Sequence, residues 1–398
     1  MAAEPKAKAH PVPPPHAAAA DKVDPAAETA ARQTGKSDAI ETLARQAIIV
    51  DFNTGTVLLE KNADELMTPS SMSKLMTVYM VFSRLKDGSL KMTDQLPVSE
   101  TAWKKHYKSG GSMMFLPLNS QASVGDLLRG VIIQSGNDAC SVLAEGLAGS
   151  EDAFAEKETR KSREIGLTQS TFRNASGLPD PNHQMTARDL SILARRLIMD
   201  FPEYYSIFAE RTFTYNNIKQ DNRNPLIWAN IAGADGLKTG HTEDGGFGEV
   251  GSVKRDNRRV IMVLNGMPTQ KARAEESERL IEWAFREFDD YSLFKPGDVV
   301  TDADVWLGVA PKVPLTVNKE VLFTLQRTAR HDMKVTVNYN GPLAAPIQKG
   351  ATVGTLVVSA PGVANVEFPL LAAADVERLG FMGRIGAAVK HILWGSNA

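Results

Sequence analysis

Three short motifs supply the residue types that serine-based acyl transfer requires. They are Ser71-Met72-Ser73-Lys74, Ser135-Gly136-Asn137 and Lys238-Thr239-Gly240, in this order along a chain of 398 residues. A serine hydroxyl becomes a nucleophile when a neighbouring group takes its proton, and a desolvated lysine can do so because burial favours its neutral form. Together the motifs predict an active serine that is activated by a lysine.

The first motif has a competitor, because Ser83-Arg84-Leu85-Lys86 fits the same Ser-x-x-Lys pattern. Ser71 follows Pro69 at the expected start of a helix, where free backbone N–H groups and the helix dipole favour negative charge. Lys74 lies one turn later on the same face, in position to take the proton of the serine. The competing pair falls at the exposed end of that helix, so Ser71 is the predicted nucleophile.

The other two motifs supply groups that would handle a substrate. Ser135 and Asn137 interrupt a buried apolar stretch, and we expect their side chains to face a cleft, relay a proton and hold a substrate amide. Lys238 and Thr239 on a strand beside the cleft would bind a carboxylate, and Gly240 would let a substrate backbone approach closely. Taken singly, each motif also fits ordinary structure: a capping serine with a surface lysine, a helix–helix turn, or a strand lysine with a turn glycine.

The segments around the motifs predict an α+β domain. Strands at both ends of this domain are expected to share one antiparallel sheet, with many helices between them in sequence. The expected elements are a strand hairpin over 47–50 and 57–59, a helix over 71–85 that ends at Asp87-Gly88, a helix-rich region over 123–208, strands over 247–253 and 259–264, and a helix over 272–288.

A second domain with an all-β pattern follows Pro296-Gly297. Short apolar runs are separated by turn signals such as Asn340-Gly341-Pro342, which predicts a small sandwich. The expected division of the chain is a disordered Ala/Pro-rich segment over 1–40, a catalytic domain over 41–290, an accessory β domain over 291–373 and an amphipathic helix over 374–398.

The predicted C-terminal helix has an apolar stripe with Arg384 and Lys390 beside it. Such a helix is expected to lie on an acidic membrane surface, or alternatively to dock on the second domain. Its apolar residues recur at steps of three and four: Leu379, Met382, Ile385, Val389 and Ile392-Leu393.

Composition excludes several other classes of protein. The 45 basic and 47 acidic residues give a net charge of -2, which does not favour nucleic acid as a partner. Cys140 is the only cysteine, so no internal disulfide is expected, and its apolar surroundings predict a buried small side chain. The 7 histidines show no metal-ligand spacing, so no metal or cofactor is expected. No apolar run is long enough to span a bilayer, and no signal peptide is visible.

The three motifs in this order resemble those of penicillin-recognising serine enzymes. Four longer segments are similar to the low-molecular-mass D-alanyl-D-alanine carboxypeptidases: Pro69-Ser70-Ser71-Met72-Ser73-Lys74-Leu75-Met76-Thr77, Asn174-Ala175-Ser176-Gly177-Leu178-Pro179-Asp180, Asn222-Arg223-Asn224-Pro225-Leu226-Ile227-Trp228 and Asp235-Gly236-Leu237-Lys238-Thr239-Gly240-His241-Thr242. The resemblance covers 41–288, and 294–371 resembles their accessory domain. It implies a serine β-lactamase/transpeptidase-like domain with helices on both sides of the sheet, followed by a small all-β sandwich domain.

The resemblance also implies a role for each catalytic residue. Ser71 would attack the carbonyl of the penultimate D-alanine, with Lys74 as general base. Ser135 would pass the proton to the leaving D-alanine, and Asn137 would orient the acyl side. Water would then release the acyl-enzyme.

The resemblance also implies that the third motif recognises the terminus of the substrate. Lys238 and Thr239 would hold the terminal carboxylate beside Gly240, and the oxyanion would lie between the backbone N–H groups of Ser71 and His241. The implied partners are peptidoglycan stem peptides and β-lactams, and the implied location is the periplasm, with membrane contact through the C-terminal helix. The alternatives are a β-lactamase, a D,D-endopeptidase, or an inactive peptidoglycan-binding module.

Overall fold

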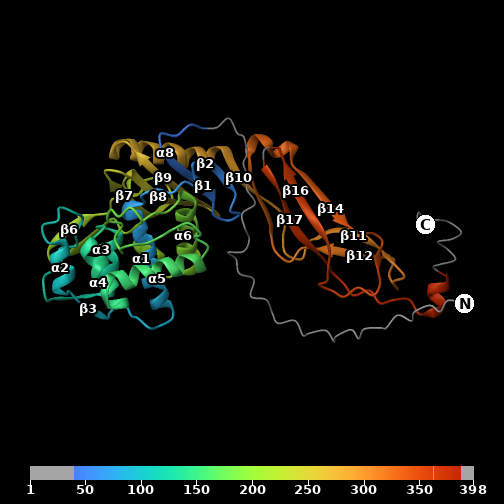
Figure 1. Cartoon of the computed structure of the whole chain (residues 1–398). Coiled ribbons are helices and arrows are strands. Elements are labelled where there is room, and N and C mark those ends of the chain that lie inside the picture. Colours follow the sequence, from blue (N-terminus) through green and yellow to red (C-terminus); the bar gives the residue numbers. More distant parts are fainter. Residues whose placement is uncertain (1–39, 362, 387–398) are drawn as a thin grey trace, which may run out of the picture.

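The first domain is built on one antiparallel sheet with the strand order β2-β1-β9-β8-β7 (Figure 1). The computed structural model describes residues 40–361 and 363–386. β1 lies between β2 and β9, and all of its residues are buried, because helices cover both faces of the sheet. The strands are β1 (Gln46–Asp51), β2 (Val57–Lys61), β7 (Ala234–Thr242), β8 (Gly246–Arg255) and β9 (Arg258–Met267).

Strands from the two ends of this domain lie side by side, as the sequence predicts. β1 pairs antiparallel with β2 to form the expected hairpin, and on its other edge it pairs with β9, where Ile48 lies opposite Val263. Alternate residues of β1 therefore enter different cores: Ile48 packs with the central helices, and Ile49 packs under the last helix of the domain.

Helices cover both faces of the sheet (Figure 1). Ser or Thr side chains accept a backbone N–H at the start of α3, α5, α6 and α8, which supports these N-termini. On one face lie α1 (Lys74–Lys86), α3 (Val124–Ile132), α4 (Asn137–Ala148), α5 (Glu151–Glu164) and α6 (Ala187–Asp200); α8 (Gln270–Glu287) covers the other.

Smaller elements complete the first domain. Two of them border the central motifs: the turn η1 (Ser70–Ser73) precedes α1, and η2 (Tyr205–Ala209) contacts β7. The others are α2 (Glu100–His106), α7 (Pro225–Trp228) and the two hairpins formed by β3 (Gln95–Pro97) with β4 (Gln121–Ser123) and by β5 (Thr212–Tyr215) with β6 (Ile218–Asp221).

The helix expected to start at Ser71 begins differently. Residues Ser70–Ser73 form a 3-10 turn, and α-helical geometry starts at Lys74. The Ser73 hydroxyl donates to the Ser70 carbonyl at 3.0 Å, which satisfies that carbonyl within the tighter turn. The predicted end of the helix at Asp87-Gly88 is confirmed.

The second domain contains a six-stranded sheet of order β14-β16-β17-β12-β11-β15 and a two-stranded sheet of β10 and β13. One apolar core lies between its elements, so the predicted sandwich is confirmed. Its elements are β10 (Phe288–Phe294), β11 (Val299–Trp306), β12 (Lys312–Thr316), β13 (Val321–Gln326), η3 (Arg327–Asp332), β14 (Lys334–Tyr339), β15 (Leu343–Ala344), β16 (Thr352–Ala360) and β17 (Val363–Ala372).

Two of the expected boundaries fall at places where the local structure differs from the prediction. β10 follows α8 directly and pairs with β13, so the expected division after residue 290 falls inside a strand that pairs within the second domain. Residues 374–380 are not helical, because Val376 bridges Ile347 and Arg378 bridges Gly308; a helix begins only at Phe381. Residues 1–39 of the predicted disordered segment and residues 387–398 of the predicted amphipathic helix lie outside the described residues. Within those residues, no helix has the length and apolar character to cross a membrane.

Substitution of Phe82 measures how much the core stabilises the first domain at α1, the helix that carries Lys74. It is fully buried on α1 and packs against the rings of Phe201, Tyr204 and Phe208. Phe82→Ala is expected to lower the free energy of unfolding by about 3–5 kcal/mol in chemical denaturation, because it leaves a cavity. The control Phe381→Ala, at a side chain that is 69% exposed, is expected to change it by less than about 0.5 kcal/mol. Equal effects in the two variants would contradict the assigned core.

Candidate active site

Lys74 lies fully buried at the start of α1 and contacts three oxygen atoms. Its Nζ atom is 2.7 Å from Ser71 Oγ, 2.8 Å from Asn137 Oδ1 and 2.5 Å from the Ser176 carbonyl oxygen. Asn137 and the Ser176 carbonyl hold the amine as acceptors, and Ser71 is half-buried with its hydroxyl against the same amine. The structure thus brings together Ser71, Lys74 and Asn137 from two of the predicted motifs.

The protonation of Lys74 suits the role of a base. Burial, with a smaller contribution from the positive charge of Arg223, lowers the pKa of Lys74 to about 8, while the charges of Asp138 and Glu151 oppose the shift. A substantial fraction of the amine is therefore neutral near pH 7–8. The neutral amine can accept the Ser71 proton across the 2.7 Å contact.

A loop from a distant part of the chain completes the surroundings of Lys74. Asn174 Oδ1 accepts the N–H groups of Ser176 and Gly177 at 3.1 and 2.7 Å, which forms a turn that aims the Ser176 carbonyl at Lys74. Gly177 has φ +74°, and a Cβ there would lie 2.0 Å from the Ser70 carbonyl oxygen. Only glycine fits this close approach.

The second and third motifs meet through a pair of side chains. Lys238 Nζ donates to Ser135 Oγ at 3.0 Å and to the Thr239 carbonyl at 2.9 Å. Ser135 lies in the break between α3 and α4 with φ +58°, so the predicted interruption of the helix is confirmed. Burial lowers the pKa of Lys238 well below its ordinary value, and the charge of Lys74 adds to this effect.

β7 places the third motif beside the nucleophile. It is an edge strand of the sheet, and Thr239 on it is buried. A Cβ on Gly240 would lie 3.1 Å from the Met72 nitrogen and from the Pro69 carbonyl oxygen, so the strand backbone passes directly against η1. His241 is exposed and stacks on Phe247, with ring centroids 3.8 Å apart.

Other nucleophile candidates lie apart from this arrangement. Cys140 is fully buried, and burial raises the pKa of its thiol to about 12, so a reactive thiolate does not form. In the competing Ser-x-x-Lys pair, the exposed Lys86 donates to the Asp200 carbonyl at 2.5 Å. Within 40–361 and 363–386, no group of His, Cys, Asp and Glu side chains is arranged to hold a metal ion.

Two arginines near the motifs were not predicted from the sequence. Arg223 is exposed and hydrogen-bonded to Ser112, and its charge lowers the pKa of both Lys74 and Lys238. Arg273 is buried in the first turn of α8, and its Nε has no hydrogen-bond partner among the described residues. Several cations with too little countercharge favour an anionic ligand.

Glu249 neutralises the positive charge of the nearby Arg273 only in part. Glu249 on β8 is fully buried and accepts a hydrogen bond from Ser277 at 2.7 Å. Burial raises the pKa of Glu249 to about 7, with the charge of Arg273 opposing the shift. Near neutral pH about half of the Glu249 carboxyl groups are therefore uncharged. No local sequence signal distinguishes Arg273 from a surface position of an amphipathic helix.

A second polar cluster anchors the start of β7. Asp235 Oδ1 accepts from Arg259 Nη1 at 2.7 Å and from the Tyr205 hydroxyl at 3.0 Å. The pairing of β7 with β8 shifts register between Ala234 and Gly236. The backbone hydrogen bonds between the two strands therefore hold the start of β7 less firmly than the rest of the strand. The Asp235 cluster therefore positions the strand segment that carries Lys238.

The fold and the site define an active-serine enzyme in which a buried lysine serves the nucleophile. A family model described as D-alanyl-D-alanine carboxypeptidase matches residues 30–269, and one described as Penicillin-binding protein 5, C-terminal domain, matches residues 288–378. The chain belongs to the D-alanyl-D-alanine carboxypeptidase family. It is 39% identical over 359 residues to D-alanyl-D-alanine carboxypeptidase DacC of Escherichia coli (strain K12), covering 89% of each chain.

Solved structures agree with this assignment and confirm the predicted fold class. Penicillin binding protein 5 from Haemophilus influenzae has a TM-score of 0.77 and 35% identity, over 85% of this chain and 98% of that one. Penicillin-Binding Protein D2 from Listeria monocytogenes, solved in the ampicillin-bound form, has a TM-score of 0.56 and 28% identity, over 62% of this chain and 98% of that one.

Lys74→Arg tests the general base. An arginine keeps the charge but does not lose its proton at accessible pH, so acylation by penicillin should slow by about 10²- to 10⁴-fold. In the unmodified protein the acylation rate should rise with pH with a midpoint near pH 8, because the neutral amine is the active form. The control Lys86→Arg should leave the rate unchanged. An unaltered rate in Lys74→Arg would exclude this role.

Asp235→Asn tests the anchor of β7. Loss of the charged contacts should raise KM for a peptide ending in D-alanyl-D-alanine by about 10- to 100-fold, the equivalent of roughly 1.5–3 kcal/mol. The effect on kcat should be smaller, because Ser71 and Lys74 lie on other elements. Asp64→Asn, which breaks an ion pair with Arg188, serves as control. A lower melting temperature with unchanged KM would show that Asp235 is only structural.

Proposed function

We propose that this protein is a serine D-alanyl-D-alanine carboxypeptidase that removes the terminal D-alanine from peptidoglycan stem peptides. The observation that carries the proposal is the direct contact of buried Lys74 with Ser71 Oγ, beside a strand that presents Lys238 and Thr239. The names and functions of the related proteins support the same activity.

Acylation begins when neutral Lys74 takes the proton of Ser71 Oγ. The oxygen then attacks the carbonyl carbon of the penultimate D-alanine, and the backbone N–H groups of Ser71 and His241 stabilise the oxyanion. Ser135, hydrogen-bonded to Lys238, passes a proton to the leaving amine. The carbon–nitrogen bond breaks, free D-alanine departs, and the acyl group stays on Ser71. Asn137 orients the acyl side through its amide.

Recognition of the chain end depends on positive charge. Lys238 and Thr239 bind the terminal carboxylate of the substrate, and Arg273 contributes a charge that Glu249 only partly neutralises. A ligand carboxylate compensates these buried cations, which restricts cleavage to the last peptide bond. Water then hydrolyses the acyl-enzyme, with no metal or cofactor in the reaction.

β-Lactams use the same site in this proposal. Their carboxylate and strained amide resemble the D-alanyl-D-alanine end, so they acylate Ser71. The ampicillin-bound relative supports this assignment by likeness. A β-lactamase or D,D-endopeptidase is less favoured, because the match to an accessory carboxypeptidase domain extends to residue 378.

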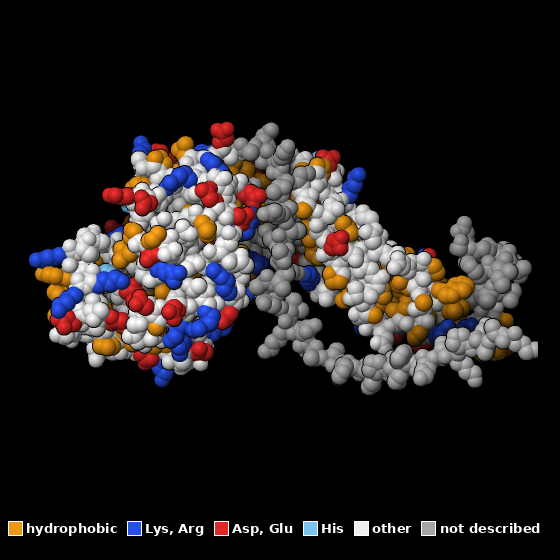
Figure 2. All heavy atoms as spheres, viewed as in Figure 1, with side chains coloured by type: hydrophobic (Ala, Val, Ile, Leu, Met, Phe, Trp, Pro, Cys, Tyr) orange, Lys and Arg blue, Asp and Glu red, His pale blue; other side chains and the backbone are white. Residues whose placement is uncertain are grey.

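The location and the accessory domain form part of the proposal. We place the catalytic domain at 41–287, the accessory domain at 288–373 and the whole protein in the periplasm, in contact with the membrane through its C-terminal end. Figure 2 shows hydrophobic side chains at the far end of the second domain. Val309, which follows β11, is 59% exposed, and its N–H donates to the Glu377 carbonyl oxygen; Phe381 and Met382, a few residues after Glu377, are 69% and 80% exposed.

Two assays on the full chain test the activity. The protein should become labelled by a fluorescent penicillin and should release D-alanine from a diacetyl-lysyl-D-alanyl-D-alanine peptide. Ser71→Ala should abolish both signals, and the control Ser83→Ala should abolish neither. Labelling without D-alanine release would favour a β-lactamase or an endopeptidase. The absence of both signals would indicate an inactive peptidoglycan-binding module.

A further inference from the structure

A buried acid lies behind the active site, and the proposed reaction does not use it. Glu158 on α5 is fully buried, and its Oε1 atom lies 2.8 Å from the hydroxyl oxygen of Thr77 on α1. Thr77 is fully buried as well, one turn after Lys74 on the same helix. The second carboxyl oxygen of Glu158, Oε2, has no hydrogen-bond partner among residues 40–361 and 363–386.

Thr77 joins Glu158 to the loop that carries Ser176. Its hydroxyl oxygen also lies 2.7 Å from the Ala175 carbonyl oxygen. Both contacts are as short as ordinary two-centre hydrogen bonds, so each needs a proton of its own. The hydroxyl group has one proton, and a carbonyl oxygen only accepts. Thr77 therefore donates to Ala175, and the proton between Thr77 and Glu158 belongs to the carboxyl group.

An ionised Glu158 does not fit this arrangement. If Thr77 donated to the carboxylate, two oxygen atoms without a proton would face each other at Ala175. If it donated to Ala175, the same conflict would arise at Glu158. Burial raises the pKa of Glu158 well above its ordinary value and the charge of Glu151 adds to this rise, while the hydrogen bond with Thr77 opposes it.

Helix α5 presents a second acid to the same loop residue. Glu151 lies two turns before Glu158, and its Oε1 atom accepts the Ala175 N–H at 3.2 Å. Burial favours the neutral form of Glu151, but the hydrogen bond and charge of Lys105 outweigh this effect and lower the pKa of Glu151. Ala175 is therefore held through its N–H by an ionised acid and through its carbonyl oxygen by Thr77.

The Ala175 carbonyl belongs to the peptide group that precedes the Ser176 carbonyl. This peptide group is held at its oxygen by Thr77 and at its N–H by Asn174, whose Oδ1 atom accepts from Ser176 at 3.1 Å. The next carbonyl oxygen, that of Ser176, lies 2.5 Å from Lys74 Nζ. Release of the Ala175 carbonyl would let the peptide group rotate and would carry the Ser176 carbonyl away from the amine.

The Ser176 carbonyl decides where the lone pair of Lys74 points. A neutral amine has two N–H groups and one lone pair. When the N–H groups donate to Ser176 and to Asn137 Oδ1, at 2.5 and 2.8 Å, the lone pair is directed at Ser71 Oγ, 2.7 Å away. Without the carbonyl, an N–H group can turn toward Ser71, and the amine then faces the nucleophile as a donor and not as a base.

We propose that Glu158 is a positioning residue: its protonated carboxyl group holds the loop whose Ser176 carbonyl directs the lone pair of Lys74. It acts through the Thr77 hydroxyl, which the carboxyl proton keeps turned toward Ala175. This role rests on the proposed function, in which Lys74 is the general base of acylation. Glu158 itself touches neither the nucleophile nor the base.

Infrared spectroscopy of the full chain tests the protonation state. The difference spectrum between the unmodified protein and Glu158→Gln at neutral pH should contain the C=O stretching band of a protonated carboxyl group. For the control Glu156→Gln, at an exposed acid of the same helix, the difference spectrum should contain carboxylate bands. Carboxylate bands from Glu158 would overturn the proposal, whatever the activity of the variants.

The rate of acylation by a fluorescent penicillin tests the positioning role. Glu158→Met has no proton to donate to Thr77, so acylation should slow by about 10- to 100-fold, as expected for a misdirected catalytic group. Its melting temperature should not fall, because the substitution also removes the buried oxygen that has no partner. Glu158→Gln supplies an N–H in place of the carboxyl proton and should recover most of the rate. The control Glu156→Met should keep the rate of the unmodified protein.

The outcomes separate this proposal from the proposed function. Normal acylation of the unmodified protein together with an unchanged rate in Glu158→Met would overturn the positioning role alone. Equal losses in Glu158→Met and Glu158→Gln would also overturn it, since the new donor would then restore nothing. Absence of acylation in the unmodified protein would overturn both. If Glu158→Met failed to fold, Thr77→Val should show the same slow acylation, and a normal rate in that variant would overturn the proposal.

Discussion

The burial of one amine underlies the rest of the site. Lys74 has no exposed surface, and its desolvation makes a neutral, basic lysine available near neutral pH. A buried amine also requires acceptors, which Asn137 and the Ser176 carbonyl provide. Helix α1, the break before α4 and the loop at Gly177 must therefore meet at this atom. The large core of the first domain provides the rigidity that keeps these three segments together.

The sequence predicted the parts of the site whose chemistry lies in side chains within short motifs. Ser71, Ser135 and Lys238 stood out because their motifs combine rare residue types with helix-start, helix-break and strand contexts. The Ser176 carbonyl was not predicted, because a backbone oxygen has no residue-type signature. Arg273 was missed because a single arginine in an amphipathic helix has the pattern of a solvated position.

The fold was predictable for a related reason. The buried strands and amphipathic helices of the first domain follow clear periodicities, and the sandwich was visible from its turns. The boundary expected near residue 290 falls inside β10, because this strand, with the sequence Phe-Asp-Asp-Tyr-Ser-Leu-Phe, continues from α8 without a turn residue. Residues 374–380 have helical spacing, but bridges at Val376 and Arg378 hold them in a non-helical conformation. Tertiary pairing overrides local preference at both places.

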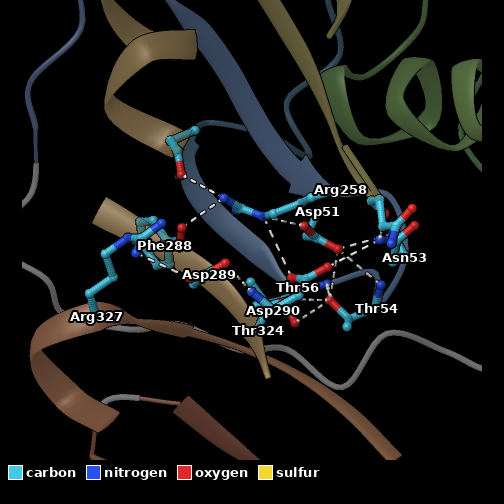
Figure 3. Close-up of polar contacts among 12 residues, drawn as sticks. Asp51, Asn53, Thr54, Thr56, Arg258, Phe288, Asp289, Asp290, Thr324 and Arg327 are labelled. Carbon is cyan, nitrogen blue, oxygen red and sulfur yellow. Dashed lines mark hydrogen bonds and ion pairs between the residues drawn. The ribbon is translucent and has the colours of Figure 1, made fainter. Parts of the chain in front are cut away.

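Helix α8 links the two ends of this architecture. Its first turn carries the buried Arg273, and at its other end Arg258 donates to the Ala284 carbonyl oxygen on α8 and to the Phe288 carbonyl oxygen at the start of β10 (Figure 3). Its 18 residues make a strut about 27 Å long. A force applied to the accessory domain at β10 would therefore reach the turn that holds Arg273 along this strut.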